Sequence, residues 1–417
     1  MDEEYNTYLC EDKVVVIEPI LKTRRIKEFV KSSAVALLKA HEYKLESITT
    51  VDYFVIIKLL DNSLVVNAIN LLKNMSGISF IFVGIPVKLK YDTIISTVST
   101  IYSNMMIVGE KYFLLVKSLI NFKLNTQESI LQRFDVEFSI QSELSSTSKK
   151  LIRVENIRDA DRIIYLLLTP DTCYVSLLLF KGQDNIPFNY LQETILCPIF
   201  DNISMISFIS VLNAGYTATP FFFYIDKQHA QKLLKTFEKL ITKSSLMQIR
   251  IYMLSIQEHI PDYIQHMFVT ENDIINMDTE TKIFHWLNLQ IIISKMLEKL
   301  NLDNKMIGLP VTPFVHPPWF IKEISNIIKE SDKIVMTPLL FNYSNQQFKA
   351  DISEFFKLDL NFNFDLNQVG QTADFDQGKF KEILRTCPII FDNLTPKYAN
   401  FTLRVGKDDI LDILNSI

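Results

Sequence analysis

Glycine is scarce in this chain, and the scarcity limits the kinds of site that the chain can build. Only 9 of the 417 residues are glycine, about 2% against a usual share of about 7%. Loops that cradle phosphate groups need glycine, because the backbone must approach the oxygens and often adopts a positive φ. The chain contains no GxGxxG, GxxxxGK or SGG cluster. The sequence therefore predicts no nucleotide site of a common glycine-rich kind.

Composition is ordinary for a soluble globular protein. The chain is long enough for two or three domains, with 48% hydrophobic and 22% charged residues. Because the net charge is −5, any contact with nucleic acid must come from a local basic patch. The four scattered cysteines lack zinc-site spacing and predict reduced thiols, a cytoplasmic protein and no metal; they are Cys10, Cys173, Cys197 and Cys387.

A membrane location is not expected. The acidic, polar N-terminal segment resembles neither a secretory signal nor a transit peptide. Residues 202–225 carry no formal charge and are long enough to span a membrane, but they include many polar residues. We predict a buried helix to about Ala214, a turn at Gly215 and then a buried strand.

The first half of the chain predicts two small α+β units. In the first, residues 1–88, the order strand, helix, two strands, helix, strand indicates a ferredoxin-like unit. Its expected elements lie at 13–21, 24–42, 46–60, 62–75 and 78–87. In the second unit, residues 89–180, the expected elements are a helix at 91–107, a strand at 111–119, a helix starting in 126–134 and strands at 151–156 and 173–180. The polar segment 141–150 is predicted to be an exposed loop.

The pattern changes from residue 192 onward. Fully apolar strands alternate with helices, which is typical of a parallel sheet with crossover helices. The expected elements lie at 195–200, 204–214, 219–225, 229–242 and 247–256. A later strand is predicted at 333–341 and a polar loop at 357–379. The predicted fold is thus an α+β half followed by an α/β parallel-sheet domain over 181–417.

Three patches of sequence, in this order, resemble the ThiI family of tRNA 4-thiouridine synthases. IEPILKTRRIKEF (17–29) is similar to the family's opening strand and basic helix. KYFLLVKSLINFKLNTQESI (111–130) resembles the core of a THUMP domain, and CYVSLLLFKG (173–182) with the following Ile186 and Pro187 resembles the connector before the ATP-binding loop. The resemblance implies ferredoxin-like, THUMP and PP-loop domains, tRNA as partner, and ATP and magnesium as cofactors of an active enzyme.

The segment that resembles the ATP-binding loop has lost its pattern. The family's S-G-G-x-D-S loop falls on Ile199, Phe200, Asp201, Asn202, Ile203 and Ser204, of which only Ser204 matches. Phe200 and Ile199 are interpreted as core residues that end a buried strand, and Asp201 would repel phosphate. Around 308–318 the family's second nucleotide segment is unrecognisable beyond Gly308. We therefore expect a retained fold without adenylation chemistry and without a cofactor.

Basic residues supply the candidate RNA contacts. Residues 13–40 hold seven basic and two acidic residues, although most such runs are solvated helix faces. The resemblance implies phosphate contacts from Lys22, Arg24, Arg25, Lys27 and Lys31 in the first unit. In the second unit the corresponding candidates are Lys111, Lys117, Lys123 and Arg133. We expect Arg24, Arg25 and Lys117 to point to water.

The remaining candidates are weak. Cys387 resembles a late cysteine of the family that handles persulfide sulfur, but its spacing to the following Pro-Lys pair differs and it lacks a partner thiol. A lone thiol is more often a packed small hydrophobe. His316 has no neighbouring Cys or His and is interpreted as structural. Trp286 and Trp319 are interpreted as core residues.

Three functions follow. The favoured one is a protein that binds tRNA or another structured RNA by shape and phosphate without adenylation. The alternative is an active ATP-dependent tRNA sulfurtransferase. The third is a scaffold whose partner is another protein, for example an active paralogue. ATP binding separates the second function from the others, and RNA binding separates the first from the third.

Overall fold

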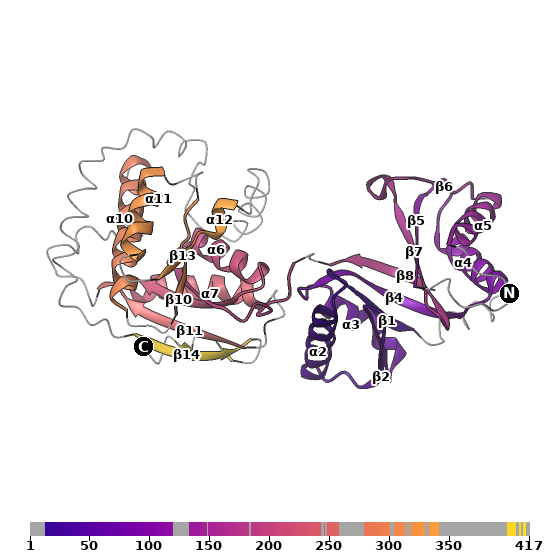
Figure 1. Ribbon diagram of the computed structural model, residues 1–417, viewed down its shortest axis with the longest axis horizontal. Helices are drawn as coiled ribbons and strands as arrows, with labels where there is room; N and C mark the ends of the chain where they lie inside the picture. The colour runs from indigo at the N-terminus through magenta and orange to yellow at the C-terminus, as the bar shows by residue number, and fades with distance from the viewer. Residues whose placement is uncertain are drawn as a thin grey trace. The chain divides into compact units, whose positions relative to one another are not determined.

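The structure is a computed structural model that divides into two compact units, Met1–Pro187 and Phe188–Ile417. Figure 1 shows the helices and strands of both units. The described residues are 13–119, 133–147, 149–182, 185–242, 246, 248–257, 279–300, 304–312, 316, 318–329, 333–341, 398–405, 408–409 and 412–413.

The N-terminal unit begins with the predicted ferredoxin-like order. Its elements are β1 (Val14–Pro19), α2 (Arg24–Ala40), β2 (Leu45–Val51), β3 (Phe54–Leu59), a short 3-10 turn (Asn62–Leu64), α3 (Val65–Leu72) and β4 (Ile78–Lys88). The strands lie in the order β2-β3-β1-β4, and all three neighbouring pairs are antiparallel. This arrangement confirms the expected α+β start of the chain.

The second half of this unit extends the same sheet. Its elements are α4 (Tyr91–Met105), β5 (Lys111–Ser118), α5 (Arg133–Ser146), β6 (Ile152–Arg153), a 3-10 turn (Ile157–Asp159), β7 (Arg162–Leu168) and β8 (Thr172–Lys181). β8 pairs with β4 along its whole length, from Phe80↔Lys181 to Lys88↔Thr172. One sheet of eight strands therefore runs through the unit in the order β2-β3-β1-β4-β8-β7-β5-β6.

Two expectations in this half were wrong. The segment 141–150 was expected to be a loop, but α5 continues to Ser146 because Val136, Ile140 and Leu144 form one buried helical face. β7 was not predicted at all, although its five residues from Ile164 to Leu168 are fully buried. A continuous apolar run of this kind is typical of a central strand. The predicted helix start at 126–132 lies outside the described residues.

The eight-stranded sheet is strongly curled. In β7, Ile164 and Leu166 pack with α4 and α5, whereas Tyr165 points to the opposite face. On that opposite face Glu18 of β1 meets Lys117 of β5, although β4, β8 and β7 separate the two strands. A flat sheet would hold these strands about 19 Å apart. The twist of the sheet therefore closes this side into a concave face.

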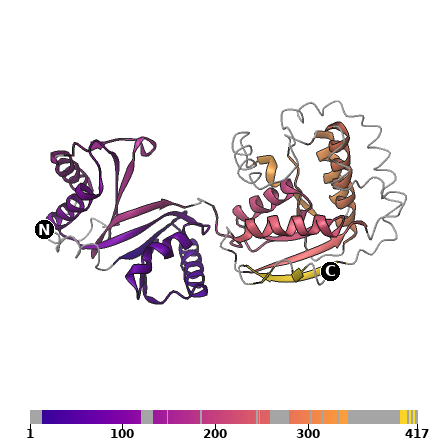
Figure 2. The same cartoon turned by 180° about the vertical axis from the view of Figure 1, so that it is seen from behind.

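The concave face is the inner side of the curled sheet. Its buried cluster consists of Val14, Val16, Tyr53, Phe54, Ile56, Phe82, Tyr165 and Leu167. Figures 1 and 2 show α2 and α3 against the β1–β4 part of the sheet, and α4 and α5 beside β5 and β7.

The C-terminal unit is a Rossmann-like α/β domain, as expected. Its elements are β9 (Thr194–Ile199), α6 (Asn202–Asn213), β10 (Thr217–Tyr224), α7 (Lys227–Thr242), β11 (Gln248–Ser255), α10 (Thr279–Lys299), β12 (Met306–Gly308), α11 (Pro318–Lys329), β13 (Ile334–Met336), α12 (Pro338–Phe341) and β14 (Ala399–Arg404). The strand order is β13-β12-β9-β10-β11-β14. The first five strands are parallel, and only β14 is antiparallel to its neighbour β11.

Both faces of this sheet are covered. Phe221 and Phe223 of β10 belong to a cluster with α10 and α11, whereas Phe222 and Tyr224 belong to a second cluster with α7. Successive residues of a strand point to opposite faces. The helices on the two sides are visible in Figures 1 and 2. Burial on both faces explains why β9 and β10 are almost entirely apolar.

The uncharged segment 202–225 has the predicted structure. It forms α6, a turn at Gly215 with φ +90, and β10. No helix among the described residues is long and apolar enough to cross a membrane. The strand expected at 333–341 was wrong in its extent, since β13 has three residues and α12 begins at Pro338. Proline suits the first position of a helix. β14 was not predicted, and the segment 357–379 lies outside the described residues.

Candidate functional site

The basic residues expected to contact RNA gather at the start of α2. The Thr23 hydroxyl caps this helix by accepting a hydrogen bond from Ile26 N at 3.3 Å. The buried side of the helix consists of Ile26, Val30, Ala34 and Leu38, which repeat every four residues. This spacing leaves the basic residues on the other faces. Lys22, Arg24 and Arg25 are exposed, and Lys27 and Lys31 are half-buried.

Two of these lysines have contacts to the turn between β2 and β3. Lys27 Nζ donates a hydrogen bond to the carbonyl of Asp52 at 2.9 Å. Lys22 Nζ lies 4.7 Å from the centroid of the Tyr53 ring. A hydrogen bond with the Tyr53 hydroxyl, and more weakly the nearby charge of Glu18, raises the pKa of Lys22. The turn thus orients the basic end of α2.

Lys117 does not point freely to water, which corrects our expectation. Its ammonium forms an ion pair with the carboxylate of Glu18, and its side chain is 27% exposed. Glu18 is buried, and its second oxygen accepts a hydrogen bond from the Tyr165 hydroxyl at 2.8 Å. Burial, and then the Glu18 charge, raises the pKa of Tyr165, which therefore stays protonated and donates. A buried carboxylate needs such partners, and Lys117 supplies one of them.

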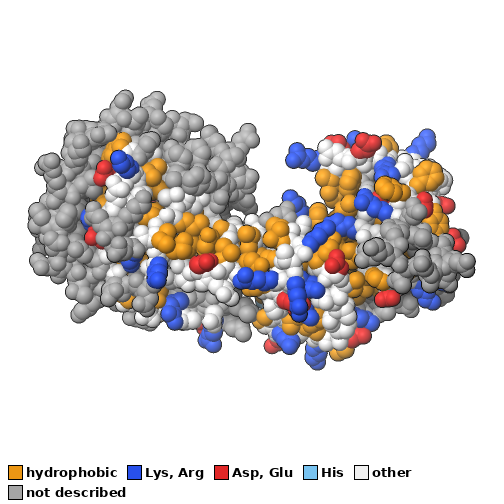
Figure 3. Space-filling view, viewed as in Figure 1, with side chains coloured by type: hydrophobic (Ala, Val, Ile, Leu, Met, Phe, Trp, Pro, Cys, Tyr) orange, Lys and Arg blue, Asp and Glu red, His pale blue; other side chains and the backbone are white. Residues whose placement is uncertain are grey.

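The other candidates of this unit are dispersed. Lys111 is exposed at the start of β5, and its backbone N–H donates to Asp161 Oδ2 at 2.9 Å. Arg133 Nε pairs with Glu137 at 2.7 Å within α5. Lys123 lies outside the described residues. Figure 3 shows Lys and Arg side chains on the visible face of this unit interspersed with acidic and apolar ones. The described residues on that face therefore form no uniform basic surface, and the basic start of α2 is a local feature.

In the C-terminal unit, the strand order places a candidate ligand crevice at β9 and β12. These two strands are neighbours, and the chain leaves them in opposite directions, since β10 lies on one side and β13 on the other. Open parallel sheets bind ligands at the carboxyl ends of such strands. The segments that follow β9 and β12 start with Phe200 and Leu309.

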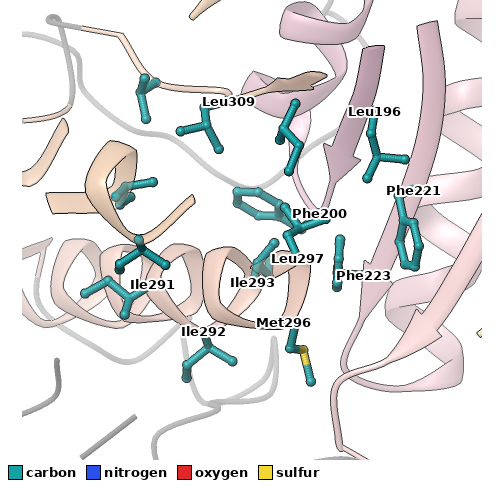
Figure 4. Close-up of a cluster of buried hydrophobic side chains, with 14 of the residues drawn as sticks. Leu196, Phe200, Phe221, Phe223, Ile291, Ile292, Ile293, Met296, Leu297 and Leu309 are labelled. Carbon is teal, nitrogen blue, oxygen red and sulfur yellow. The ribbon is translucent and has the colours of Figure 1, made fainter. Parts of the chain in front are cut away.

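Apolar side chains fill this crevice. Phe200 is 3% exposed and Ile203 is 7% exposed, and both belong to a buried cluster with Leu309 and Val311. Helix α10 contributes Ile291, Ile292, Ile293, Met296 and Leu297 to the same cluster. Figure 4 shows Phe200 in the space between β9 and α10. The expected burial of Ile199 and Phe200 as core residues at a strand end is confirmed.

The loop after β9 is held by hydrogen bonds among its own residues. Asp201 caps α6, accepting a hydrogen bond from Ser204 N at 2.7 Å, and the Ser204 hydroxyl accepts from Phe200 N and Asp201 N at 2.9 Å each. His229 Nε2 lies 3.1 Å from the carbonyl of Phe200. The carboxylate of Asp201 therefore occupies the helix N-terminus, a position that favours an anion. Asn202 is the first residue of α6 and is half-buried.

His316 is structural, as interpreted from the sequence. It is 1% exposed, its Nδ1 lies 3.1 Å from both the N and the carbonyl O of Thr312, and its Nε2 lies 2.9 Å from Gln290 Oε1. Burial lowers the pKa of His316 to about 3, so the ring is neutral. Trp319 packs against the same apolar cluster as Phe320.

The described thiols are suited to packing. Cys173 and Cys197 are buried, and burial raises the pKa of both; that of Cys173 reaches about 12. Such thiols are poor nucleophiles at neutral pH. Cys10 and the weak candidate Cys387 lie outside the described residues. Within the described ranges, no three His, Cys, Asp or Glu residues are grouped to hold a metal ion.

Three residues of the N-terminal unit, Glu18, Tyr53 and Tyr165, were not among the predicted site residues. A signal existed for Glu18, because it is the one charged residue in the otherwise apolar run VVVIEPIL (14–21). A charged residue in a buried strand is expected to have a partner. Nothing in the sequence indicated that the partners come from β5 and β7, since the contacts depend on the curl of the sheet.

Solved structures are similar to most of this chain. No protein-family model matches the sequence, and no curated protein does. The crystal structure of a 4-thiouridine synthetase in complex with RNA and with bound ATP is similar at a TM-score of 0.57 and 11% identity, covering 94% of this chain and 100% of that chain. The crystal structure of PH1313 from Pyrococcus horikoshii Ot3 is similar at a TM-score of 0.56 and 13% identity, covering 82% and 99% respectively. This chain therefore shares the fold of a 4-thiouridine synthetase.

Proposed function

We propose that this protein binds structured RNA through the N-terminal unit, with tRNA as the favoured ligand. We also propose that it lacks the adenylation activity of 4-thiouridine synthetases. The fold likeness to a synthetase that was solved with RNA supports the partner. The resemblance of the sequence patches to the same family supports it independently. Because the sequence is only 11% identical to that synthetase, the absence of adenylation activity is argued from the residues of this chain.

The observation that carries the proposal is the position of Arg24 and Arg25 in the first turn of α2. That turn contains no acidic residue. The N-terminus of a helix carries a partial positive charge, which disfavours basic side chains and favours anions. Arg24 and Arg25 beside it add to that positive charge and strengthen the attraction for a phosphate. A phosphate contact accounts for basic residues at a place where stability alone favours acidic ones.

The residues at the crevice of the C-terminal unit do not fit a nucleotide. A phosphate-binding loop presents free backbone N–H groups at a helix N-terminus. Here the N–H groups of Phe200, Asp201 and Ser204 are engaged within the loop. The Asp201 carboxylate would also repel a phosphate, and Phe200 fills the space. For these reasons we propose that the unit uses neither ATP nor magnesium, which disfavours the active sulfurtransferase.

A salt titration of tRNA binding tests the RNA part of the proposal. We expect the wild type to bind tRNA more tightly at low salt, with the logarithm of affinity falling linearly with the logarithm of salt concentration. The double reversal Arg24→Glu and Arg25→Glu should weaken binding and reduce this slope by about one unit for each phosphate that the variant no longer neutralises. Lys117 is left unchanged because its ion pair with Glu18 is part of the fold.

The control is a reversal of equal charge in the C-terminal unit, Lys235→Glu with Lys322→Glu, at two exposed positions. If the control weakens binding as much as the double reversal, the net charge decides and the α2 contact is wrong. If the wild type binds no tRNA at low salt, the scaffold function replaces this proposal. Calorimetry with ATP and magnesium tests the second part, and a micromolar site would contradict it.

A further inference from the structure

The carboxylate of Glu18 lies inside the concave face and holds two partners. Glu18 is 4% exposed, and its oxygens contact Lys117 Nζ and the Tyr165 hydroxyl. Replacing a buried ion pair with apolar residues is often neutral or stabilising. The rest of β1 is apolar, and Val14 and Val16 show that this face accepts such side chains. Stability alone therefore gives no reason for a carboxylate here.

A second ammonium group, that of Lys22, lies over a ring of the same buried cluster. Lys22 follows Glu18 by four residues and lies 4.7 Å over the ring of Tyr53. Tyr53 belongs to the same buried cluster as Tyr165, the other partner of Glu18. Lys117 lies 6.0 Å from the centroid of the half-buried Phe80 ring. Glu18 is ion-paired with Lys117 of β5, and its charge also acts on Lys22, which precedes α2.

The charges of this group match one phosphodiester. Two ammonium groups and one carboxylate together carry a single net positive charge, and a phosphodiester carries a single negative charge. Two lysines that approach each other repel, and a carboxylate placed beside both reduces that repulsion. Lys22 is exposed and Lys117 is 27% exposed, so both ammonium groups are within reach of solvent. The aromatic rings beneath them restrict their positions.

We infer that Lys22, Lys117 and the Tyr53 hydroxyl form a site for one phosphodiester group of bound RNA, with Glu18 as its positioning residue. The inference rests on the proposed function and names a contact shared by the segment before α2, the β2–β3 turn and β5. Glu18 does not touch the phosphate. It holds Lys117 across the curl of the sheet, so that the lysines of both halves meet one phosphate together.

The substitution Glu18→Gln tests positioning against simple charge. It keeps the size of the side chain and an oxygen for the Tyr165 hydroxyl, and it raises the net charge of the protein by one. If only the net charge mattered, the Glu18→Gln protein would bind RNA more tightly. If Glu18 positions Lys117, this protein should bind tRNA at low salt about three- to tenfold more weakly, because the half-buried Lys117 loses its ion pair. Equal or tighter binding by the Glu18→Gln protein would overturn the inference.

A second variant keeps the test decisive if Glu18→Gln does not fold. Lys22→Met changes an exposed residue and should weaken tRNA binding by a similar factor. In the Glu18→Gln background, Lys22→Met should have a smaller effect than in the wild type. The control is Lys90→Met, at an exposed position outside this group. An effect of Lys90→Met equal to that of Lys22→Met contradicts the site.

The outcomes separate this inference from the proposed function. If the wild type binds no tRNA, both are wrong. If the wild type binds and the Arg24, Arg25 double reversal weakens binding, but Lys22→Met and Glu18→Gln do not, only the phosphodiester site is wrong. Circular dichroism and thermal unfolding of each variant confirm that weaker binding does not arise from unfolding.

Discussion

The two units differ in the side chains that fill a concave place on their central sheets, the concave face in one and the crevice in the other. In the N-terminal unit, a carboxylate enters the concave face and is paired with Lys117 and the Tyr165 hydroxyl. In the C-terminal unit, the crevice where such folds bind ligands is filled by Phe200 and Ile203. A buried carboxylate is costly unless it is paired, whereas apolar side chains fill a crevice without that requirement. The difference teaches that the curled sheet of the first unit accommodates a paired charge, whereas the crevice of the second is filled by apolar packing.

The largest expected effect tests whether the crevice is a true core. Phe200→Ala should destabilise the C-terminal unit by about 3–5 kcal/mol, because it removes a buried ring and leaves a cavity. The matched control is Phe138→Ala on α5, where the ring is 72% exposed and the change should cost within about 0.5 kcal/mol. Urea unfolding measures both, with tryptophan fluorescence for the C-terminal unit, which contains Trp286 and Trp319, and circular dichroism for the other. A destabilisation below about 1 kcal/mol in Phe200→Ala would mean an open crevice.

The next effect depends on pH. The pKa of His316 falls from the usual 6.5 to about 3 on folding, so the unfolded chain takes up the proton first. The stability contributed by the neutral ring is complete above pH 6.5 and declines as the pH falls toward 3. The His316 contribution should be smaller at pH 5 than at pH 7 by about 2 kcal/mol. Unfolding of the wild type and His316→Gln at both pH values isolates this contribution, and an equal decline in both proteins would contradict it.

A smaller effect concerns the loop that occupies the helix N-terminus. Asp201→Ala removes the capping box of α6 and should cost about 1 kcal/mol. The neighbouring change Asn202→Ala, at a residue that is half-buried, serves as control and should stay within about 0.5 kcal/mol. The difference between the two free energies of unfolding measures how much the Asp201 carboxylate stabilises the N-terminus of α6. Equal costs would mean that the cap is dispensable.

Much of the fold could be predicted from the pattern of apolar residues. The helix-turn-strand structure of 202–225 followed from its lack of charge and from Gly215, and the parallel sheet followed from strands that are apolar on both faces. The misses have physical causes. α5 continues through 141–146 because Leu144 is anchored in the core, which outweighs the polar residues around it. β13 is three residues long because Pro338 begins α12 at once.

The candidate site was less predictable than the fold. The burial of Phe200 followed from the loss of glycine around it. The pairing of Lys117 could not be predicted, because it depends on a sheet that curls until side chains of β1 and β5 reach each other. Local patterns describe the neighbours of a residue along the chain, but a contact between residues 99 positions apart is a property of the whole sheet. Tyr53 and Tyr165 escaped prediction for the same reason.

The double reversal Arg24→Glu with Arg25→Glu should change the stability only slightly, and the sign of that change sharpens the comparison. The first turn of α2 has no acidic residue, so two glutamates there should interact favourably with the partial positive charge of the helix N-terminus. The N-terminal unit should therefore be unchanged or stabilised, by about 0.3–1 kcal/mol for each glutamate, while tRNA affinity falls. Lys235 lies in the interior of α7 and away from its N-terminus, so Lys235→Glu should leave the stability of its unit within about 0.5 kcal/mol. Thermal unfolding at low salt, where screening is weak, measures the difference. If the double reversal lowers both stability and tRNA affinity, the arginines hold the fold together, and the weaker RNA binding would no longer identify them as phosphate contacts.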